Sequence, residues 1–326
     1  MTPEFIDPTV NAPAYNPSVI CNPSVICNPE VWRAETRVSA ARYFPVRCGL
    51  GAAALLLIAV ALRWGVAPAF ERLPADYSGE TGYSAKLTSR QTPSSPAEEC
   101  ESIVRRHEQT LTCGEKQSVI QGDMQWSTTA GVMIFETLNT YGVDRNGRQN
   151  LAEYGNEKRE GQYLFPPHTA KQPYKLWDPV YAGPRSATFD HVAKFHGVEV
   201  FVFKTLADGV DETAGFVSLP GFPDKYHGLS YGKGRYWIEP VSGVAVNHED
   251  SGTSYFVDAK TGERVGGPIA QWSQRFTPET IQAQVRLAKA TRRWICALEI
   301  WLPLASGAAG LIVGAAGIRA WREIDG

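Results

Sequence analysis

The sequence lacks an excess of charge of either sign. Its 32 Lys and Arg residues nearly balance its 34 Asp and Glu residues, which leaves a formal charge of −2. Proteins that bind nucleic acid through its phosphates need a basic surface, so no nucleic acid is expected among the partners. Apolar residues, in contrast, make up 43% of the chain, enough for a folded core, and wholesale disorder is excluded.

Motifs for cofactors and catalysis are also missing. The absence of Cys-x-x-Cys excludes zinc ribbons, thiol-redox sites and c-type haem attachment, and neither a phosphate loop nor a dinucleotide fingerprint occurs. Ser230 has nucleophile-elbow spacing, but strand-like residues follow it where a helix is required. Asp144 begins a stretch like a calcium loop that lacks the required Gly and Glu. The six His residues show no zinc spacing. We therefore expect no enzyme, no cofactor and no metal, with a hydrolase using Ser230 as the weakest alternative.

Two long apolar segments are present, at residues 48–70 and 300–318. Each is long enough to cross a bilayer as a helix. Trp294, Trp301 and Trp321 flank the second segment like an interfacial aromatic belt. The alternative for the first segment is a cleaved signal peptide ending near Ala67–Ala69, although the residues ahead of it are many for that class.

Basic residues set the expected topology. They precede the first span and follow the second, at Arg33, Arg37, Arg42, Arg47, Arg319 and Arg322. By the positive-inside rule both termini are cytoplasmic, so residues 71–276 are exported from a bacterial inner membrane. Residues 33–47 are predicted to form a short interfacial helix, residues 277–299 an amphipathic helix leading into the second span, and residues 319–326 a cytoplasmic end.

The exported region is predicted to be mainly β, a twisted antiparallel sheet or meander between the two transmembrane helices. Three segments, at 143–147, 238–244 and 257–263, have an acidic residue followed by Asn, Ser or Thr before Gly, as hairpin loops require. Residues 197–203 form the clearest strand. Cys100 and Cys113 are the two cysteines of this region, and their isolation in an oxidising compartment predicts a disulfide, with two free thiols as the alternative.

The N-terminal residues 1–32 are predicted to form an extended, Pro-rich cytoplasmic tail. The four-residue motif Asn/Asp-Pro-x-Val occurs four times in this tail, and its last three copies are spaced six residues apart. Such turns cannot form a core but could present aliphatic side chains to a partner. The partner-binding residues of this strap would be Val10, Val19, Ile20, Val25, Ile26 and Trp32; a plain linker is the alternative.

The membrane spans carry two further signals. A small-residue face for another helix, or for a flat ring, is offered by Gly307, Gly310, Gly314 and Gly317. Arg63 and Glu299 lie at comparable heights, about 24 and 30 Å along their helices. They could form an ion pair, or each could reach the headgroups separately.

Several motifs of the β region resemble the porin PorA family. They are Gly161–Pro167, Tyr174–Pro179, Gly197–Phe203 and Trp237–Gly243. The resemblance implies a bacterial envelope protein with a β-rich domain between two membrane helices, and it implies no catalytic residues. The chain lacks the many alternating strands of a porin barrel, so the family name is not taken as the function.

These observations together predict a non-catalytic accessory subunit that stabilises a larger membrane protein complex. Its partners would be other membrane protein subunits and the lipid bilayer, and cofactor-rich respiratory or photosynthetic assemblies recruit subunits of this kind. The alternative is an envelope module that binds or transports a lipid or another apolar ligand. A large apolar cavity in the β domain would favour that alternative.

Overall fold

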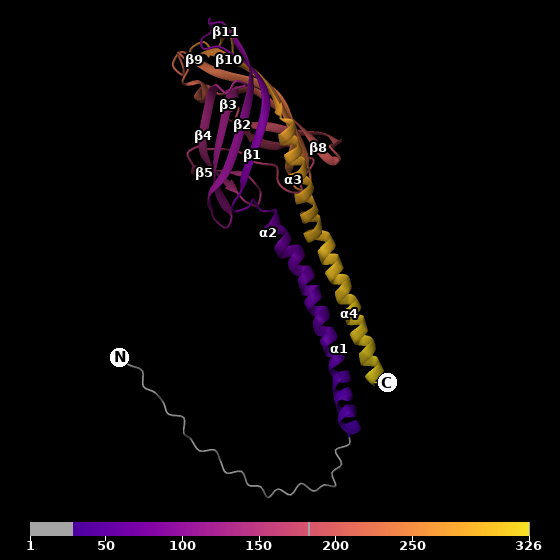
Figure 1. Cartoon of the computed structure of the whole chain (residues 1–326). Coiled ribbons are helices and arrows are strands. Elements are labelled where there is room, and N and C mark those ends of the chain that lie inside the picture. Colours follow the sequence, from indigo (N-terminus) through magenta and orange to yellow (C-terminus); the bar gives the residue numbers. More distant parts are fainter. Residues whose placement is uncertain (1–28, 182, 326) are drawn as a thin grey trace, which may run out of the picture. The chain divides into compact units, whose positions relative to one another are not determined.

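A computed structural model describes residues 29–181 and 183–325 of the chain (Figure 1). The described residues form one antiparallel sheet of eleven strands and two long helical segments. They divide into two compact units. One unit, Leu56–Gly307, contains the whole sheet, and the other contains the helical residues up to Leu55 and from Ala308 onward.

The first helical segment is continuous. Helix α1 (Pro29–Ala61) runs into a π-helical turn, η1 (Leu62–Val66), and then into α2 (Ala67–Glu71). The predicted interfacial helix of residues 33–47 and the predicted first span therefore belong to one continuous helix, with Pro45 inside it. Residues Tyr43–Glu71 are long and apolar enough to cross a membrane.

The second helical segment begins where the sequence predicts. Thr277 caps α3 (Pro278–Cys296) by accepting a hydrogen bond from the Thr280 N–H, and Pro278 occupies the first turn. A second π-helical turn, η3 (Ala297–Trp301), leads into α4 (Leu302–Asp325). Residues Pro278–Ile324 also meet the length and composition of a membrane span.

The sheet has the order β5-β4-β3-β2-β1-β11-β10-β9-β8-β7-β6, with every neighbouring pair antiparallel. It is therefore a meander in which the first and last strands pair. The strands are β1 (Ser78–Ser89), β2 (Glu98–Cys113), β3 (Gln117–Thr128), β4 (Met133–Asp144), β5 (Asn150–Gly155), β6 (Tyr174–Asp178), β7 (Gly183–Phe195), β8 (Val198–Asp211), β9 (Tyr226–Glu239), β10 (Val244–Asp258) and β11 (Arg264–Phe276). A short 3₁₀ turn, η2 (Thr213–Phe216), lies between β8 and β9.

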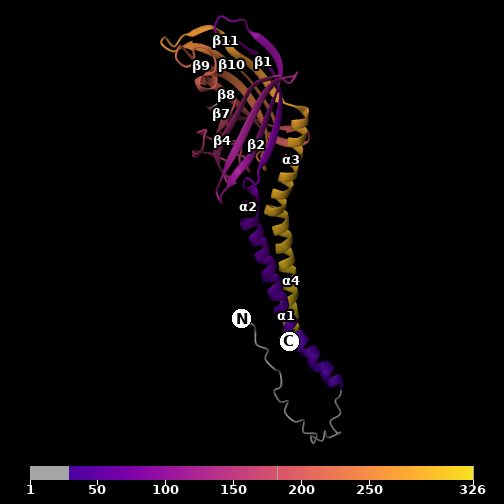
Figure 2. The same ribbon diagram turned by 60° about the vertical axis from the view of Figure 1, so that its left-hand side comes forward.

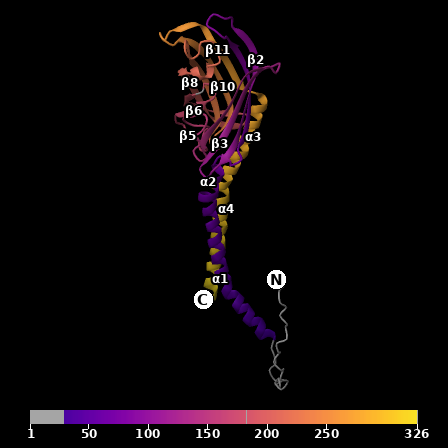
Figure 3. The same cartoon turned by 90° about the vertical axis from the view of Figure 1, so that its left-hand side faces the viewer.

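The strands curl around a common interior and nearly close into a barrel (Figures 2 and 3). The seam lies between β5 and β6, which do not pair directly. Gln162 bridges it: the residue forms one isolated bridge with Gln149 and another with Leu176 of β6. The fold is thus a mainly antiparallel β domain with two helices able to span a membrane, as predicted in outline. The expectation that the chain lacks many alternating strands is wrong, because eleven strands with alternating burial nearly close into a barrel.

The interior of the sheet is filled by side chains, many of them aromatic. One cluster includes Tyr83, Trp126, Tyr181 and Trp272, and another includes Phe165, Tyr174 and Phe203. Helix α3 packs on the outer face instead, mainly against β10, where Val285 and Ala288 belong to one apolar cluster with Val246 of β10 and the valines of β8. Figure 2 shows α3 running along the outside of the sheet. The predicted apolar stripe of this helix is confirmed by these contacts.

The three predicted turn segments do connect strands, namely β4 to β5, β9 to β10 and β10 to β11. Gly243 and Gly262 have the positive φ that such turns require, at 72° and 74°. In the first turn the positive φ falls on Arg148 instead of Gly147. Asp144 explains this difference, because its carboxylate accepts the Gly147 N–H and fixes the glycine in the turn.

Candidate functional site at the helix–sheet junction

Each helical segment carries a π-turn just before a proline. In η1 the Ala67 N–H donates to the Leu62 carbonyl, and in η3 the Leu302 N–H donates to the Ala297 carbonyl. Pro68 and Pro303 follow directly, and a proline removes the regular hydrogen bond to the residue four positions earlier. π-turns within α-helices are frequent at functional sites. The two π-turns contact each other within the sheet-containing unit.

The two π-turns bring Arg63 and Glu299 together. The Arg63 Nη1 lies 3.2 Å from the Glu299 Oε1, with the Glu299 side chain largely buried and that of Arg63 partly exposed. These are the two charges whose heights along the helices match in the sequence. The sequence left two alternatives, an ion pair between Arg63 and Glu299 or a separate extension of each side chain to the headgroups. The structure has the ion pair.

Two further residues join this pair, and we call the four residues Arg63, Glu71, His168 and Glu299 the junction cluster. The His168 Nε2 lies 3.4 Å from the Glu71 Oε1 and 3.4 Å from the Glu299 Oε2. Glu71 is the last residue of α2, and His168 comes from the loop before β6. The cluster therefore links both helical segments to a loop of the β domain.

The loop holds His168 in an uncommon backbone conformation. Its φ is 55°, and its N–H donates to the Val241 carbonyl, while the Thr169 N–H donates to the Pro240 carbonyl. The same β9–β10 turn also anchors α3. Buried Glu239 accepts from Arg292 of that helix at 3.1 Å. The turn thus fixes both the histidine and the helix that leads to Glu299.

A second charged cluster lies inside the sheet, and we call Asp178, Arg185, Asp250 and His248 the interior cluster. The Arg185 Nη1 donates to Asp178 at 2.8 Å and to Asp250 at 2.7 Å. Burial lowers the pKa of His248 to about 3, so its imidazole is neutral. The two carboxylates and the imidazole are donors of the metal-binding kind and lie close together. A cation there would compete with the guanidinium that already holds both carboxylates.

The cavity beside this cluster is very small, about 10 Å³. It is lined by His248, Gln274, Tyr83 and others, and the His248 Nε2 and Gln274 Oε1 have no partner among the described residues. This volume is on the order of one water molecule. This cavity, formed by described residues, is therefore too small for a lipid or a comparable apolar ligand.

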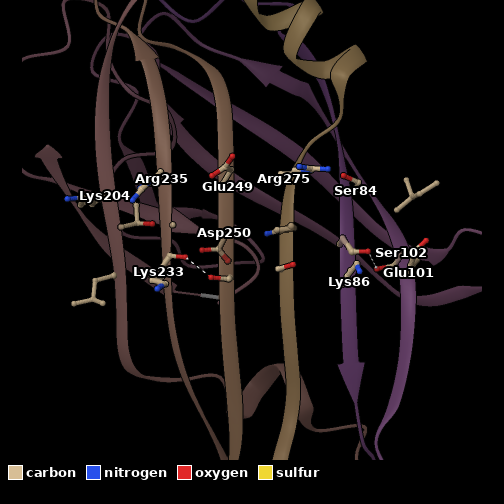
Figure 4. A pocket seen from close by; sticks show the side chains of 18 of the residues that line it. Ser84, Lys86, Glu101, Ser102, Lys204, Lys233, Arg235, Glu249, Asp250 and Arg275 are labelled. Atoms are coloured by element: carbon tan, nitrogen blue, oxygen red, sulfur yellow. Dashed lines mark hydrogen bonds between the residues drawn. The ribbon is translucent and has the colours of Figure 1, made fainter. Parts of the chain in front are cut away.

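A hollow of about 1040 Å³ lies on the outer face of the sheet (Figure 4). Figure 4 shows its charged side chains rising from neighbouring strands, with Lys204, Arg235, Glu249 and Arg275 in one row. Its other charged lining residues include Lys86, Glu101 and Lys233. The lining thus combines charged side chains of both signs with uncharged and apolar ones.

Ser230 does not have the local structure of a nucleophile elbow. It is fully buried in β9, which continues through it as a strand, as its sequence predicts, whereas an elbow needs a helix after the serine. Its hydroxyl donates to Glu212 and contacts Ser254. Burial raises the pKa of Glu212 to about 7.

The predicted disulfide between Cys100 and Cys113 is also wrong. Both thiols are free, and both residues belong to β2. Thirteen positions along one strand separate their Cα atoms by roughly 43 Å, at about 3.3 Å per residue. A disulfide needs Cα atoms roughly 5.5 Å apart. A disulfide would require the chain between the two cysteines to turn back on itself. In the structure this segment is one extended strand.

The glycine face of the second span is partly used in the helical unit. A Cβ added to Gly317 would lie 2.7 Å from the Cys48 Cβ, and one added to Gly314 would lie 3.4 Å from the Ala52 Cβ. Gly310 is buried, whereas a Cβ on Gly307 would meet no atom within 4 Å. Gly314 and Gly317 thus let α4 approach α1 closely, as small residues do in membrane helix pairs.

The predicted strap falls largely outside the described residues. This applies to Val10, Val19, Ile20, Val25 and Ile26, while Trp32 belongs to α1. The sequence analysis missed Glu71 and His168 as members of the junction cluster. The Pro166–Pro167 pair just before His168 is a local sequence signal, because it indicates a constrained backbone at this loop. The contacts of His168 with Glu71 and Glu299 join residues far apart in the sequence, and no local pattern predicts them.

Comparisons with known proteins give one informative match. No curated protein matches the sequence. An exported protein with a YmcC-like fold from Bacteroides fragilis aligns with 63% of this chain and 97% of its own, at 10% identity and a TM-score of 0.23. An acyl-CoA thioesterase II from Mycobacterium marinum aligns with 61% and 80%, at 11% identity and a TM-score of 0.12. At such TM-scores neither likeness supports an argument.

The sequence model of the family described as porin PorA matches residues 46–319. The match begins near the start of the first apolar helical region and ends within α4, so it includes the whole β domain and the junction cluster. The resemblance that the sequence motifs indicate is confirmed, and the chain belongs to the porin PorA family.

Proposed function

We propose that this protein is a non-catalytic accessory subunit that stabilises a larger membrane protein complex. In this proposal the two helices lie in a bacterial inner membrane, both termini are cytoplasmic, and the β domain is exported. The basic residues that flank the helices support this orientation. The partners are other membrane protein subunits, of which a respiratory or photosynthetic assembly is one setting.

The observation that carries the proposal is an unpaired apolar edge of the sheet. Strand β4 pairs with β3 along its length, but β5 pairs with β4 only at Tyr141–Val143. From Met133 to Asn139, one side of β4 therefore has no strand partner among the described residues. An edge of this kind offers free backbone groups that can pair with another chain. Natural proteins usually protect such edges with charges or prolines.

This edge is instead lined by large apolar side chains that are exposed on both faces. Their exposed fractions run from 36% to 63%, at Val132, Met133, Ile134, Phe135 and Leu138. A contiguous exposed apolar patch marks an interaction site in a soluble region. Covering each of these side chains would contribute on the order of 1–3 kcal/mol. The patch is therefore a strong candidate for the contact with a partner subunit.

The filled interior supports the same proposal over the binding of an apolar ligand. The cavity of about 10 Å³ beside the interior cluster is too small for a lipid, and charged residues from several strands stand in the lining of the outer hollow. A module that carries lipid would need an apolar cavity of several hundred Å³. Contact with a partner along the sheet edge requires no cavity.

The tail is the second contact in this proposal. Its aliphatic residues would lie on the cytoplasmic face of the partner, and each repeat would contribute on the order of 1–3 kcal/mol before entropy losses. Deletion of residues 1–27 should leave membrane insertion intact and loosen the complex. If the truncated protein copurified with the same partners and the same thermal stability, the tail would be only a linker.

The edge contact is tested by charge substitution. The double variant Ile134→Asp/Leu138→Asp should lose its partners when the native protein is purified in mild detergent and the copurifying subunits are identified. Val217→Asp is the matched control, because Val217 is equally exposed but lies outside the edge, after η2. Retention of all partners by the double variant, at control levels, would refute the edge as the docking surface.

A further inference from the structure

We propose that Glu71, His168 and Glu299 bind a divalent transition-metal ion of the zinc class at the helix–sheet junction. The three side chains each offer one donor atom, and these atoms all lie within 4.8 Å of one another. They come from α2, from the loop before β6 and from η3, three elements that are far apart in the sequence. This inference goes beyond the accessory role and does not depend on it.

The distances from the histidine to the two carboxylates fit the coordination of zinc. The His168 Nε2 is equally distant, at 3.4 Å, from the Glu71 Oε1 and the Glu299 Oε2. Two ligands of a tetrahedral ion with bonds of about 2.0–2.1 Å lie roughly 3.3 Å apart. The carboxylate oxygens of Glu71 and Glu299 lie within 4.8 Å of each other, so a bound ion would draw these two side chains toward itself.

The donor types also select this class of metal. An imidazole with two carboxylates suits zinc and neighbouring transition metals better than calcium or magnesium, which prefer oxygen ligands alone. Three protein ligands leave one tetrahedral position for water. The His168 side chain is 47% exposed, so water and metal can reach the site.

Arg63 has a defined place beside this site. Its Nη1 contacts the Glu299 Oε1, which leaves the other oxygen, Oε2, directed to His168. Outer partners that orient a ligand in this way typically change metal affinity by about 10–100-fold. The backbone hydrogen bonds of His168 and Thr169 to the β9–β10 turn hold the histidine in position. The site thus has ligands on three elements, and it is supported by Arg63 and by the β9–β10 turn.

A bound ion would tie the two helical segments to the β domain. In its absence, only the direct contacts of His168 with Glu71 and Glu299 join these elements. A metal site binds an ion with a defined stoichiometry, and direct side-chain contacts alone do not.

The test uses the full chain, purified without a histidine tag in mild detergent and stripped with EDTA. After equilibration with zinc and dialysis, metal analysis should give about one zinc ion per chain. His168→Ala and Glu71→Gln should lose this ion, and Arg63→Gln should weaken binding by roughly 10-fold. Cobalt in place of zinc should show the absorption of a tetrahedral ion in the wild type only.

His191→Ala is the matched control. His191 is exposed and contacts one carboxylate, that of Asp190, at 2.9 Å, so it has the local chemistry of His168 without the second carboxylate. This variant should bind zinc like the wild type. The proposal is overturned if the wild type retains no zinc, or if His168→Ala retains as much as His191→Ala. Neither result would bear on the partner contacts of the β4 edge.

Discussion

The interior cluster and the junction cluster use the same chemistry in different surroundings. Inside the sheet, Arg185 lies between Asp178 and Asp250, and these three side chains are no more than 5% exposed. At the junction, Arg63 and His168 lie beside Glu71 and Glu299. The side chains of Arg63 and His168 are both more than 40% exposed. Burial keeps water away from the first cluster, whereas water can reach the second.

The difference also separates structural from functional roles. A buried ion pair loses most of its solvation, so removing one member leaves an uncompensated charge and destabilises the fold strongly. A partly exposed pair contributes little to stability. The charges at the junction should therefore contribute much less to stability than those of the interior cluster.

The largest effect should come from breaking the interior cluster. Arg185→Leu leaves Asp178 and Asp250 buried without their partner and should lower the free energy of unfolding by about 3–5 kcal/mol. Chemical denaturation of the full chain in detergent measures this loss. Lys204→Leu removes an exposed pair with Asp190 and should cost about 1 kcal/mol or less. Equal losses in the two variants would contradict the distinction between the clusters.

A second effect of burial is a pH dependence that arises from Glu212. Because its folded pKa is raised from 4.5 to about 7, the folded state holds the proton more tightly than the unfolded state. Stability should therefore fall as the pH rises from about 4.5 to about 7, by up to roughly 3 kcal/mol. Glu212→Gln should remove this component, which appears as the difference between wild-type and variant denaturation curves. Parallel curves across this range would show that Glu212 does not titrate there.

A smaller effect is expected in the helix pair, where no charge is involved. Gly317→Leu would force α4 away from Cys48 and Pro45 of α1 and should cost about 1–3 kcal/mol. Gly307→Leu, on the same helical segment, meets no atom within 4 Å and should be neutral. Thermal unfolding in lipid nanodiscs compares the two. If Gly307→Leu were the more harmful change, the assignment of the packing face would be wrong.

The smallest effect should come from the junction cluster in metal-free protein. Arg63→Gln removes a partly exposed ion pair and should lower stability by about 1 kcal/mol or less, a change in Tm of roughly 2–4 °C at most. The measurement is thermal unfolding in the presence of EDTA. A loss as large as that of Arg185→Leu would place the junction among the structural clusters and weaken the comparison.

Much of the fold follows from local patterns in the sequence. The apolar runs, the Thr277–Pro278 helix start and the three hairpin turns are short-range signals, and each lies where it was predicted. The continuity of α1 through residue 47 was missed because a change in polarity does not by itself end a helix. The disulfide failed because the spacing of two cysteines does not reveal whether the chain between them turns back.

The candidate site was predicted only in part, for a physical reason. Arg63 and Glu299 could be paired from their heights along two straight helices, since rise per residue is fixed. His168 reaches the same point through a loop, whose path depends on its hydrogen bonds to the β9–β10 turn. The burial of His248 could not be anticipated either, because alternate strand positions give a face but do not say which face is interior.

The pairing of β1 with β11 has a consequence for how the chain is made. Tyr83 of β1 lies opposite Phe276 of β11. One edge of β1 pairs with β2, and its other edge stays unpaired until β11, the last strand, has been made. During synthesis β1 to β5 can assemble as one meander, yet β1 keeps an unpaired edge until β11 has been made. The second helical segment follows β11 directly, so the domain is completed only as that segment is being synthesised, and a chain truncated before β11 should leave the β1 edge exposed.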